Sequence, residues 1–171
     1  MMSANRPVPP QQPVRKEGEK AVRPKDAATI IIWRKQRRRV EVLMGERHRA
    51  HKFLPHRYVF PGGRVDPQDA RVRAASEMSP AVNAQLSRTT RKGRARSIAI
   101  AAIRETFEET GLIIGAGDPL PHRPPPGGWE QFFDAGYAPA LDRLEYIARA
   151  ITPVFRPIRF DAWRGLCPNN A

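Results

Sequence analysis

The feature that most constrains the fold is the segment Ile98 to Thr110, which has the composition of an amphipathic helix. It is rich in Ala and Glu, and it ends at Gly111, a residue type that favours the left-handed conformation after a helix. At about 100° per residue, its apolar side chains fall on one face and its acidic side chains span the opposite side. The apolar set is Ile100, Ile103 and Phe107, and the acidic set is Glu105, Glu108 and Glu109.

Three neighbouring glutamates on one helix face favour a cation site. Like charges at positions i, i+3 and i+4 repel one another by a few tenths of a kcal/mol per pair, and a bound cation removes that repulsion. Mg²⁺ is suited to such a set, because it prefers carboxylate oxygens and leaves positions open for water and substrate phosphate. For these side chains taken alone, a solvated acidic face without a metal is the alternative.

The N-terminal part of the chain divides into a tail and a hairpin. Residues Met1 to Asp26 carry five prolines and almost no periodic apolar residues, so we expect a disordered tail over 1–26. Order is expected from Ala27, because Thr29 to Trp33 is a β-branched run typical of a buried strand. Val40 to Met44 fits the return strand. The hairpin tip, Arg34 to Arg39, is either a solvated turn or a contact for phosphate.

A short strand and an insertion are expected next. Tyr58 to Phe60 is a brief apolar strand, and the following Pro61, Gly62 and Gly63 predict a turn. Residues 70–96 show no strong apolar stripe, so they are interpreted as an insertion. Within it the sequence favours two short helices and a basic segment, over Ala70–Glu77, Pro80–Leu86 and Arg88–Arg96.

The C-terminal part is less regular in sequence. Residues 118–128 contain five prolines and predict an irregular loop. Trp129 to Tyr137 fits a short helix, and Leu144 to Ile151 fits a strand, although its alanines leave a helix open. Residues 162–171 show neither pattern and are expected to be an irregular tail. We therefore expect a truncated or frame-shifted chain, with a sheet edge or an active-site wall left unfinished.

Length and composition narrow the class of protein. The 171 residues suffice for one ordinary domain, and the net charge of +13 should attract anions such as nucleotides, coenzymes or nucleic acid. The only cysteine, Cys167, excludes an intrachain disulfide. No apolar stretch approaches a membrane span, and no signal peptide is apparent. The expectation is a soluble cytoplasmic protein without membrane contact, whose oligomeric state stays open, a dimer included.

The acidic helix and its surroundings resemble a known motif. The stretch Arg104 to Leu112 reads R-E-x-x-E-E-x-G-apolar and lies downstream of a Phe-Pro-Gly-Gly sequence, as in the box of the Nudix hydrolase family. The resemblance implies an α/β fold over 27–161, an α/β/α sandwich with a mixed sheet. It also implies hydrolysis of a nucleoside diphosphate linked to another group, with Mg²⁺ or Mn²⁺ as cofactor.

The resemblance also implies roles for particular residues. Glu108 and Glu109 are similar to metal ligands of that family, and Glu105 to a further ligand or to the base that deprotonates the attacking water. Arg104 resembles the arginine that orients a glutamate, a role compatible with a simple ion pair to Glu108. No protein nucleophile is implied, because the metal lowers the pKa of a bound water that attacks phosphorus.

The paired glycines carry an implied role as well. Gly62 and Gly63 resemble the turn that brings backbone close to the metal and the substrate phosphate. A purely structural turn is the alternative.

The motif departs from the usual G-x5-E-x7-R-E pattern in two places. The first glutamate of the motif is replaced by Asp69, a shorter carboxylate. Whether Asp69 takes over the role of that glutamate is left open by the sequence. The box arginine is expected at position 77 and stands at 104, so 104 − 77 = 27 additional residues divide the box. A split box resembles the subgroup that includes coenzyme A and acyl-CoA diphosphatases. Coenzyme A would suit a set of basic residues that could equally be a solvated loop: Arg47, Arg49, Lys52 and Arg57.

Two other interpretations are weighed against this one. His48, His51 and His56 lack a cysteine or acidic fourth ligand nearby, which disfavours zinc. A catalytically inactive scaffold that binds nucleotide or RNA is the rival function, supported by the positive charge. Nucleic acid is thus a possible partner, but a small-molecule diphosphate is favoured.

Overall fold

A mixed sheet forms the centre of the computed structural model, which describes residue 18 and residues 20–46, 57–117 and 128–168. In this part of the chain five strands form one sheet, in the order β2-β1-β9-β8, with β5 also paired to β1. Strands β1 and β9 are parallel, and the other pairs are antiparallel. The strands are β1 Lys25–Gln36, β2 Arg39–Val42, β5 Gly62–Arg64, β8 Glu145–Ile151 and β9 Phe160–Pro168.

Two small antiparallel pairs flank this sheet. They are formed by β3 Gly45–Glu46 with β4 Tyr58–Val59, and by β6 Gly115–Gly117 with β7 Tyr137–Pro139. The expected strand at Tyr58 to Phe60 is therefore confirmed with one residue fewer.

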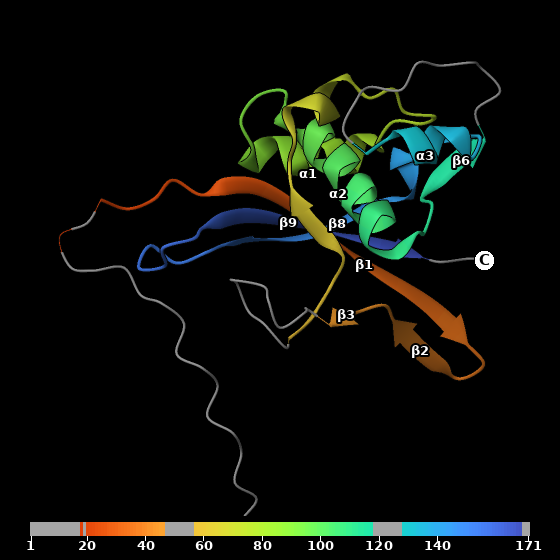
Figure 1. The fold of residues 1–171 in the computed structure, drawn as a ribbon, viewed down its shortest axis with the longest axis horizontal. Coiled ribbons are helices and arrows are strands. Elements are labelled where there is room, and N and C mark those ends of the chain that lie inside the picture. The colour runs from red at the N-terminus through yellow and green to blue at the C-terminus, as the bar shows by residue number, and fades with distance from the viewer. Residues whose placement is uncertain (1–17, 19, 47–56, 118–127, 169–171) are drawn as a thin grey trace, which may run out of the picture.

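The described helices lie on one side of the main sheet (Figure 1). They are η1 Pro67–Arg71, α1 Pro80–Thr89, α2 Arg94–Thr110, α3 Glu130–Asp134 and η2 Leu141–Arg143. The expected helix at Ile98 to Thr110 is confirmed and begins four residues earlier. The α/β fold with a mixed sheet is confirmed as well.

The N-terminal hairpin shows why its sequence makes strands. In β1 the side chains of Ala28, Ile30 and Ile32 are buried beneath α2, whereas the residues between them are more exposed. This alternation is what the two-residue period of a strand gives when one face meets a core. The turn is only Arg37 and Arg38, so the hairpin is confirmed but its tip is shorter than expected.

Order begins earlier than expected. Lys25 and Asp26 are the first residues of β1, and they pair with the first residues of β9. The assignment of residues up to 26 to a disordered tail was therefore wrong for these two. Asp26 is held by ion pairs with Arg94 and Arg91, which no local pattern reveals.

The supposed insertion belongs to the core. Val72, Val82 and Leu86 are buried in the same apolar cluster as α2, so the statement that residues 70–96 lack an apolar stripe was wrong for α1. The helix expected at Ala70–Glu77 is also wrong, because a 3₁₀ turn ends at Arg71 and the chain then runs extended to the bridge between Ser76 and Ala140. A buried face of two residues one helical turn apart is too short to stand out in sequence.

The C-terminal tail is the clearest correction. Residues 162–168 belong to β9, a strand with neighbours on both sides, β1 and β8. Trp163 and Cys167 are buried in the apolar cluster that includes the residues of α2. Pairing on both edges satisfies the backbone groups of this strand, and this overrides a weak local propensity.

The C-terminal helix and strand expectations otherwise hold. The helix expected from Trp129 is confirmed as the shorter α3, with Phe132 fully buried, and the strand expected at Leu144 to Ile151 is confirmed as β8. Residues 118–127 of the expected loop lie outside the described residues.

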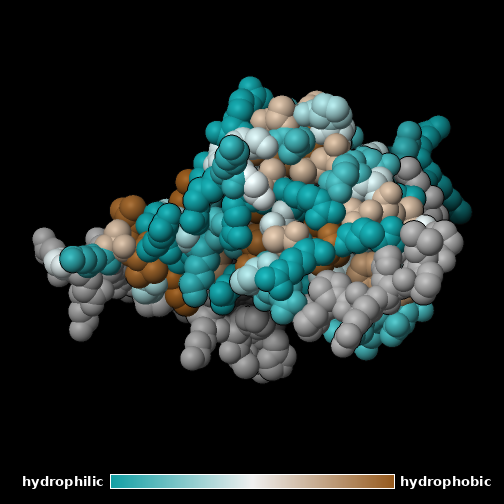
Figure 2. Space-filling model, turned by 90° about the horizontal axis from the view of Figure 1, so that it is seen from above, coloured by the Kyte–Doolittle hydropathy of each residue, from teal (hydrophilic) through white to brown (hydrophobic). Residues whose placement is uncertain are grey.

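The surface has one apolar end. Figure 2 shows hydrophobic side chains gathered at the left end of the molecule, where the loop between β8 and β9 lies in Figure 1. The exposed apolar side chains of that region are Ile151, Val154, Phe155 and Ile158. In the part of the chain that the structure describes, no helix has the length and hydropathy needed to cross a bilayer.

Candidate metal and diphosphate site

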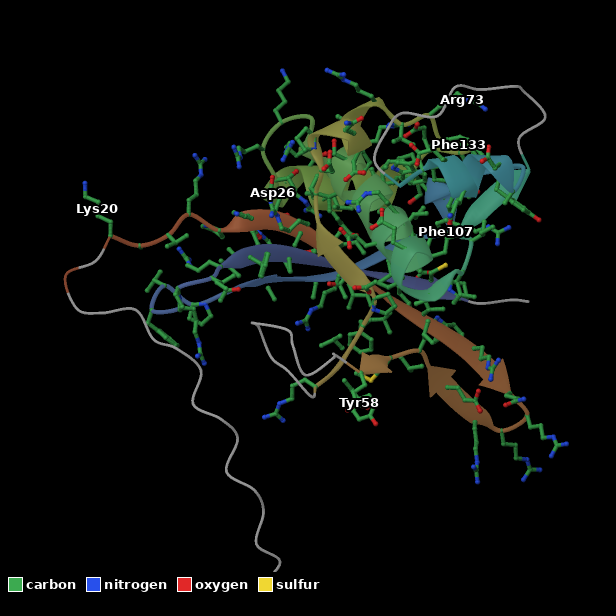
Figure 3. All side chains as sticks on the ribbon, in the orientation of Figure 1. Lys20, Asp26, Tyr58, Arg73, Phe107 and Phe133 are labelled. Carbon is green, nitrogen blue, oxygen red and sulfur yellow. The ribbon has the colours of Figure 1, made fainter. Side chains whose placement is uncertain are left out.

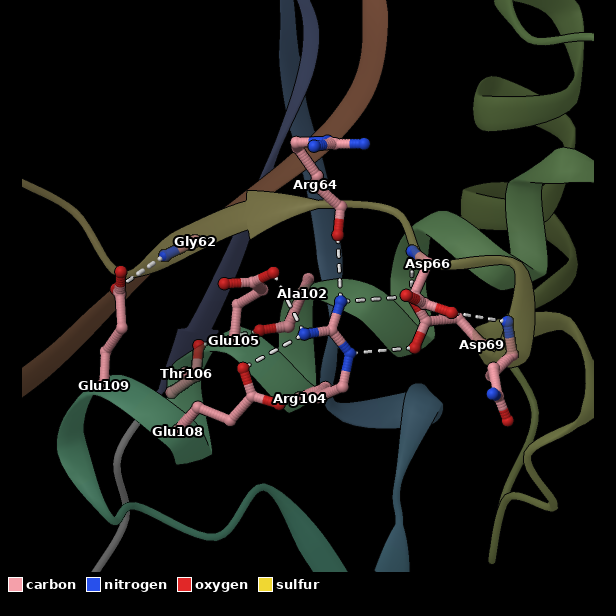
Figure 4. Close-up of polar contacts among 11 residues, drawn as sticks. Gly62, Arg64, Asp66, Asp69, Ala102, Arg104, Glu105, Thr106, Glu108 and Glu109 are labelled. Carbon is pink, nitrogen blue, oxygen red and sulfur yellow. Dashed lines mark hydrogen bonds and ion pairs between the residues drawn. The ribbon is translucent and has the colours of Figure 1, made fainter. Parts of the chain in front are cut away.

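The three glutamates lie at the C-terminal end of α2, next to β5 (Figure 4). Glu108 and Glu109 are exposed, and Glu105 is partly buried. The backbone N–H of Gly62 donates to Glu109 Oε2 at 3.0 Å. A Cβ atom added at Gly63 would overlap the carboxylate of Glu105, so a larger residue there would displace that carboxylate.

The two glycines do not form the expected turn. Gly62 and Gly63 are in β5 and pair with Thr29 and Ala28 of β1. The conformation of Gly62 is nonetheless one that other residues avoid, with φ of 150°, and a Cβ there would overlap the carbonyl oxygen of Ala28. The expected close approach of this backbone to the acidic residues is present, but it is made by a strand.

Arg104 is the centre of the polar network beneath the glutamates (Figure 4). Its side chain is almost fully buried. Nη1 donates to Glu105 Oε1 at 3.0 Å and to Glu108 Oε2 at 3.1 Å. Nη2 also donates to the carbonyl oxygen of Arg64 at 2.9 Å, which ties α2 to β5. The expected ion pair with Glu108 is thus present, and Arg104 contacts Glu105 as well.

Asp69 holds the other edge of Arg104. Its carboxylate accepts from Arg104 Nε at 3.0 Å and from Nη2 at 3.2 Å. It also accepts from the backbone N–H of Asp66, at 2.7 Å, as part of the cap of η1. Because Asp69 is fully buried and its two oxygens are engaged, it does not stand with the glutamates of α2. Its position in the motif therefore corresponds to a support for Arg104.

Burial and neighbouring charges both act on the pKa values of Arg104 and Glu105, and each of these pKa values is raised. Burial lowers the pKa of Arg104, but the hydrogen bond and the charge of Asp69 outweigh it, so the guanidinium pKa is raised and the charge is permanent. Burial raises the pKa of Glu105, and the charges of Glu108 and Glu109 act in the same direction, while Arg104 opposes them. The net effect is that the pKa of Glu105 is raised above its ordinary value.

The three carboxylates are the type of ligand that a hard divalent cation prefers, but their oxygens are too far apart to bind one together. Glu105, Glu108 and Glu109 each engage one carboxylate oxygen in a hydrogen bond from Arg104 or Gly62, and the second oxygen of each has no such bond. Among the described residues, however, no three acidic, histidine or cysteine side chains are gathered closely enough to hold an ion. A cation would have to draw the free oxygens together by rotation of flexible glutamate side chains.

Gly128, in the segment before α3, also lies next to the site. A Cβ atom at Gly128 would overlap Oε1 of Glu108, so the segment leading into α3 lies directly over that carboxylate. Behind it, Trp129 and Phe107 each pack edge-on against Phe132, at ring separations of 5.1 Å. This aromatic cluster fixes the end of α2 against α3.

A cleft of about 630 Å³ opens beside β5. It is lined by Gly62 and Gly63 of β5 and by Ala27, Ala28 and Thr29 of β1. Its other walls carry aromatic and basic side chains, chiefly Tyr58, Phe60, Phe155, Arg64, Arg156 and Arg164. Tyr58, labelled in Figure 3, is strongly exposed.

Among the described residues, the arginines that line this cleft are Arg64, Arg156 and Arg164. Arg57 is exposed and does not belong to its lining, and Arg47, Arg49 and Lys52 lie outside the described residues. The three histidines considered for zinc also lie outside them. Sequence reasoning missed Arg156 and Arg164. Arg164 comes near β5 because Thr29 of β1 pairs with Arg164 on one edge and with Gly62 on the other, and such long-range pairing leaves no local signal.

The chain is similar in sequence and fold to known Nudix hydrolases. No family model matches the chain. A curated Caenorhabditis elegans protein, putative nudix hydrolase 7, is 36% identical over 89 residues, which are 52% of this chain and 22% of that protein. The chain therefore spans about a fifth of the length of this relative.

A solved structure is similar over most of the chain. The crystal structure of a NUDIX hydrolase from Alicyclobacillus acidocaldarius matches with a TM-score of 0.68 and 28% identity, over 86% of this chain and 70% of that one. The chain has the Nudix fold, and its sequence is similar to that of Nudix hydrolases.

Proposed function

We propose that this chain, with the Nudix fold and a Nudix-like acidic helix, is a diphosphatase that hydrolyses a nucleoside-diphosphate-linked metabolite. Glu105, Glu108 and Glu109 would hold Mg²⁺ or Mn²⁺, which neutralises phosphate charge and activates a water molecule. The fold and the sequence, which are similar to those of Nudix hydrolases, support this proposal.

One observation carries the proposal above the others. Arg104 is clamped by Asp69 on one edge and contacts two of the three glutamates with its remaining Nη1. A buried arginine bound in this way holds one carboxylate oxygen of Glu105 and one of Glu108 in place. A solvated acidic face needs no such support, so the clamp favours a site over a merely polar surface.

The chain's own residues would divide the work. Arg104 positions Glu105 and Glu108, and the N–H of Gly62 positions Glu109. Glu105 has a raised pKa and lies deepest, which suits the group that accepts a proton from water.

The cleft beside β5 supports a substrate that is both anionic and partly apolar. Arg64, Arg156 and Arg164 offer guanidinium groups to phosphates, and Tyr58 and Phe155 offer aromatic surface to a base or an acyl-type chain. Coenzyme A-like molecules combine these parts, so we favour them over dinucleotides and oxidised nucleotides.

A substrate screen tests the proposal. We expect coenzyme A, ADP-ribose, NADH or a dinucleotide polyphosphate to be cleaved in the presence of Mg²⁺ and left intact in EDTA. Glu109→Gln should reduce kcat by about a hundredfold or more, since the metal's charge stabilisation depends on its ligands. Glu130→Gln, an equal charge change at the start of α3, is the matched control and should retain activity. Unchanged turnover in Glu109→Gln would refute the assignment.

The second candidate is an inactive scaffold that binds nucleotide or RNA. It is favoured by the charge of +13 and by the ungathered carboxylates of the described site. RNA affinity that falls steeply with salt, in a protein without metal-dependent turnover, would establish it in place of the hydrolase.

A further inference from the structure

A cavity of about 460 Å³ lies at the opposite end of α2 from the glutamates. The residues before β1, the end of α1, the first turn of α2 and the strands β8 and β9 all contribute to its walls. From Arg94 to Glu105 the helix rises about 16 Å, so this cavity is separate from the carboxylate site. Its volume falls in the range of small-molecule sites.

The walls of this cavity hold an excess of positive charge. Five arginines and two aspartates line it, which leaves three positive charges uncompensated. The arginines are Arg23, Arg88, Arg91, Arg94 and Arg149, and the aspartates are Asp26 and Asp161.

The aspartates are already committed. Asp26 accepts two hydrogen bonds from Arg94, at 3.1 and 2.9 Å, and Asp161 accepts two from Arg149. Arg149 also lies over the ring of Trp163, 5.0 Å from its centroid. These pairs hold two guanidinium groups in the wall of the cavity, whose Asp26 is labelled in Figure 3.

The remaining arginines have donors to spare. The side chains of Arg23 and Arg88 make no ion pair or hydrogen bond within the described part of the chain. Arg91 makes one ion pair, with Asp26 at 3.8 Å, and its side chain is 63% exposed. The hydroxyls of Thr89 and Thr90 donate to the carbonyl oxygen of Leu86, so the donors left to a ligand are guanidinium groups.

We propose that this cavity is a second binding site, for a ligand that carries two or more phosphate groups. Guanidinium forks match phosphate oxygens in geometry and remain charged at all working pH values. Three uncompensated charges around one small cavity require a compact multivalent anion for neutrality. The positive end of the α2 dipole points the same way. Three arginines of the basic segment Arg88 to Arg96, which the carboxylate site does not use, line this cavity and would bind the phosphates.

Binding in EDTA tests the site without contribution from a metal-dependent reaction. The probes are tripolyphosphate, measured by calorimetry, and a fluorescent single-stranded RNA 12-mer, measured by anisotropy across a salt series. Arg88→Ala/Arg91→Ala should weaken binding of the preferred probe by about tenfold or more, and the salt slope should fall by about two. Binding of tripolyphosphate identifies a free polyphosphate ligand, and binding of RNA alone identifies a nucleic-acid backbone.

A matched variant separates a local site from general attraction. Arg37→Ala/Arg38→Ala removes the same charge at the β1–β2 turn, about 36 Å along the strand from Asp26. It should retain affinity. Equal losses in the two variants, or no binding of either probe by the wild-type chain, would overturn the proposal.

The outcome is independent of the proposed hydrolase activity. Arg88→Ala/Arg91→Ala should cleave its substrate in Mg²⁺ as the wild-type chain does, and Glu109→Gln should bind the probe with unchanged affinity. If the arginine variant keeps the affinity of the wild-type chain, the phosphates are held elsewhere and the second site does not exist.

Discussion

Removal of Arg104 tests whether the clamp described above supports both the fold and the glutamates. We consider Arg104→Met, which keeps much of the side-chain length and removes the charge. In the wild-type chain the guanidinium satisfies the fully buried Asp69 through two hydrogen bonds. After substitution, the Asp69 carboxylate keeps only the backbone N–H of Asp66.

The cost follows from the burial of the pair. Breaking a buried ion pair by removing one partner costs about 3–5 kcal/mol, since an uncompensated charge is left behind. For a domain of this size, this loss lowers Tm by roughly 6–20 °C. Asp69→Asn should cost less, about 1–3 kcal/mol, because Arg104 keeps Glu105, Glu108 and the Arg64 carbonyl as partners. The double variant should be more stable than the sum of the two losses predicts, by about 1–3 kcal/mol.

Urea unfolding followed by tryptophan fluorescence measures these differences. Arg34→Met, which breaks the exposed pair with Glu41, is the matched control and should cost under about 1 kcal/mol. The reasoning is refuted if Arg104→Met is no more destabilising than Arg34→Met. It is also refuted if Asp69→Asn keeps full stability but loses metal affinity, because Asp69 would then act as a ligand.

The remaining predictions concern single positions. Gly128→Ala should lower kcat severalfold, measured by steady-state kinetics, because the added Cβ displaces the Glu108 carboxylate. Gly136→Ala is the control: its φ is similarly positive but the space around it is open, so it should lower only the melting temperature. Cys167 should react with a thiol reagent at least about a hundredfold more slowly in the folded chain than in urea, since it is buried and burial raises its pKa. Because the folded thiol binds its proton more tightly, its contribution to stability falls as pH rises above the ordinary thiol value; a Cys167→Ala variant should lack this decline, and fast labelling of the folded chain would contradict the buried placement.

Sequence sufficed where a short pattern was complete in itself. The helix at Ile98 to Thr110, the hairpin after Ala27 and the strand at Leu144 to Ile151 were all predicted, because period and composition carry these elements. The motif at the end of α2 also indicated the fold and the acidic set. The motif could not show whether Asp69 joins that set, because the residue type does not reveal that Asp69 is buried.

Tertiary structure decided what depends on partners distant in sequence. Residues 162–168 become a strand only because β1 and β8 offer backbone groups on both edges, and Val82 and Leu86 become core only because α2 lies beside them. The arginines of the supposed insertion meet Asp26 and β8 through the same folding of the sheet. Local pattern fixes which elements form; long-range pairing and burial determine which side chains meet, since a hydrogen bond or an ion pair depends on distance in space.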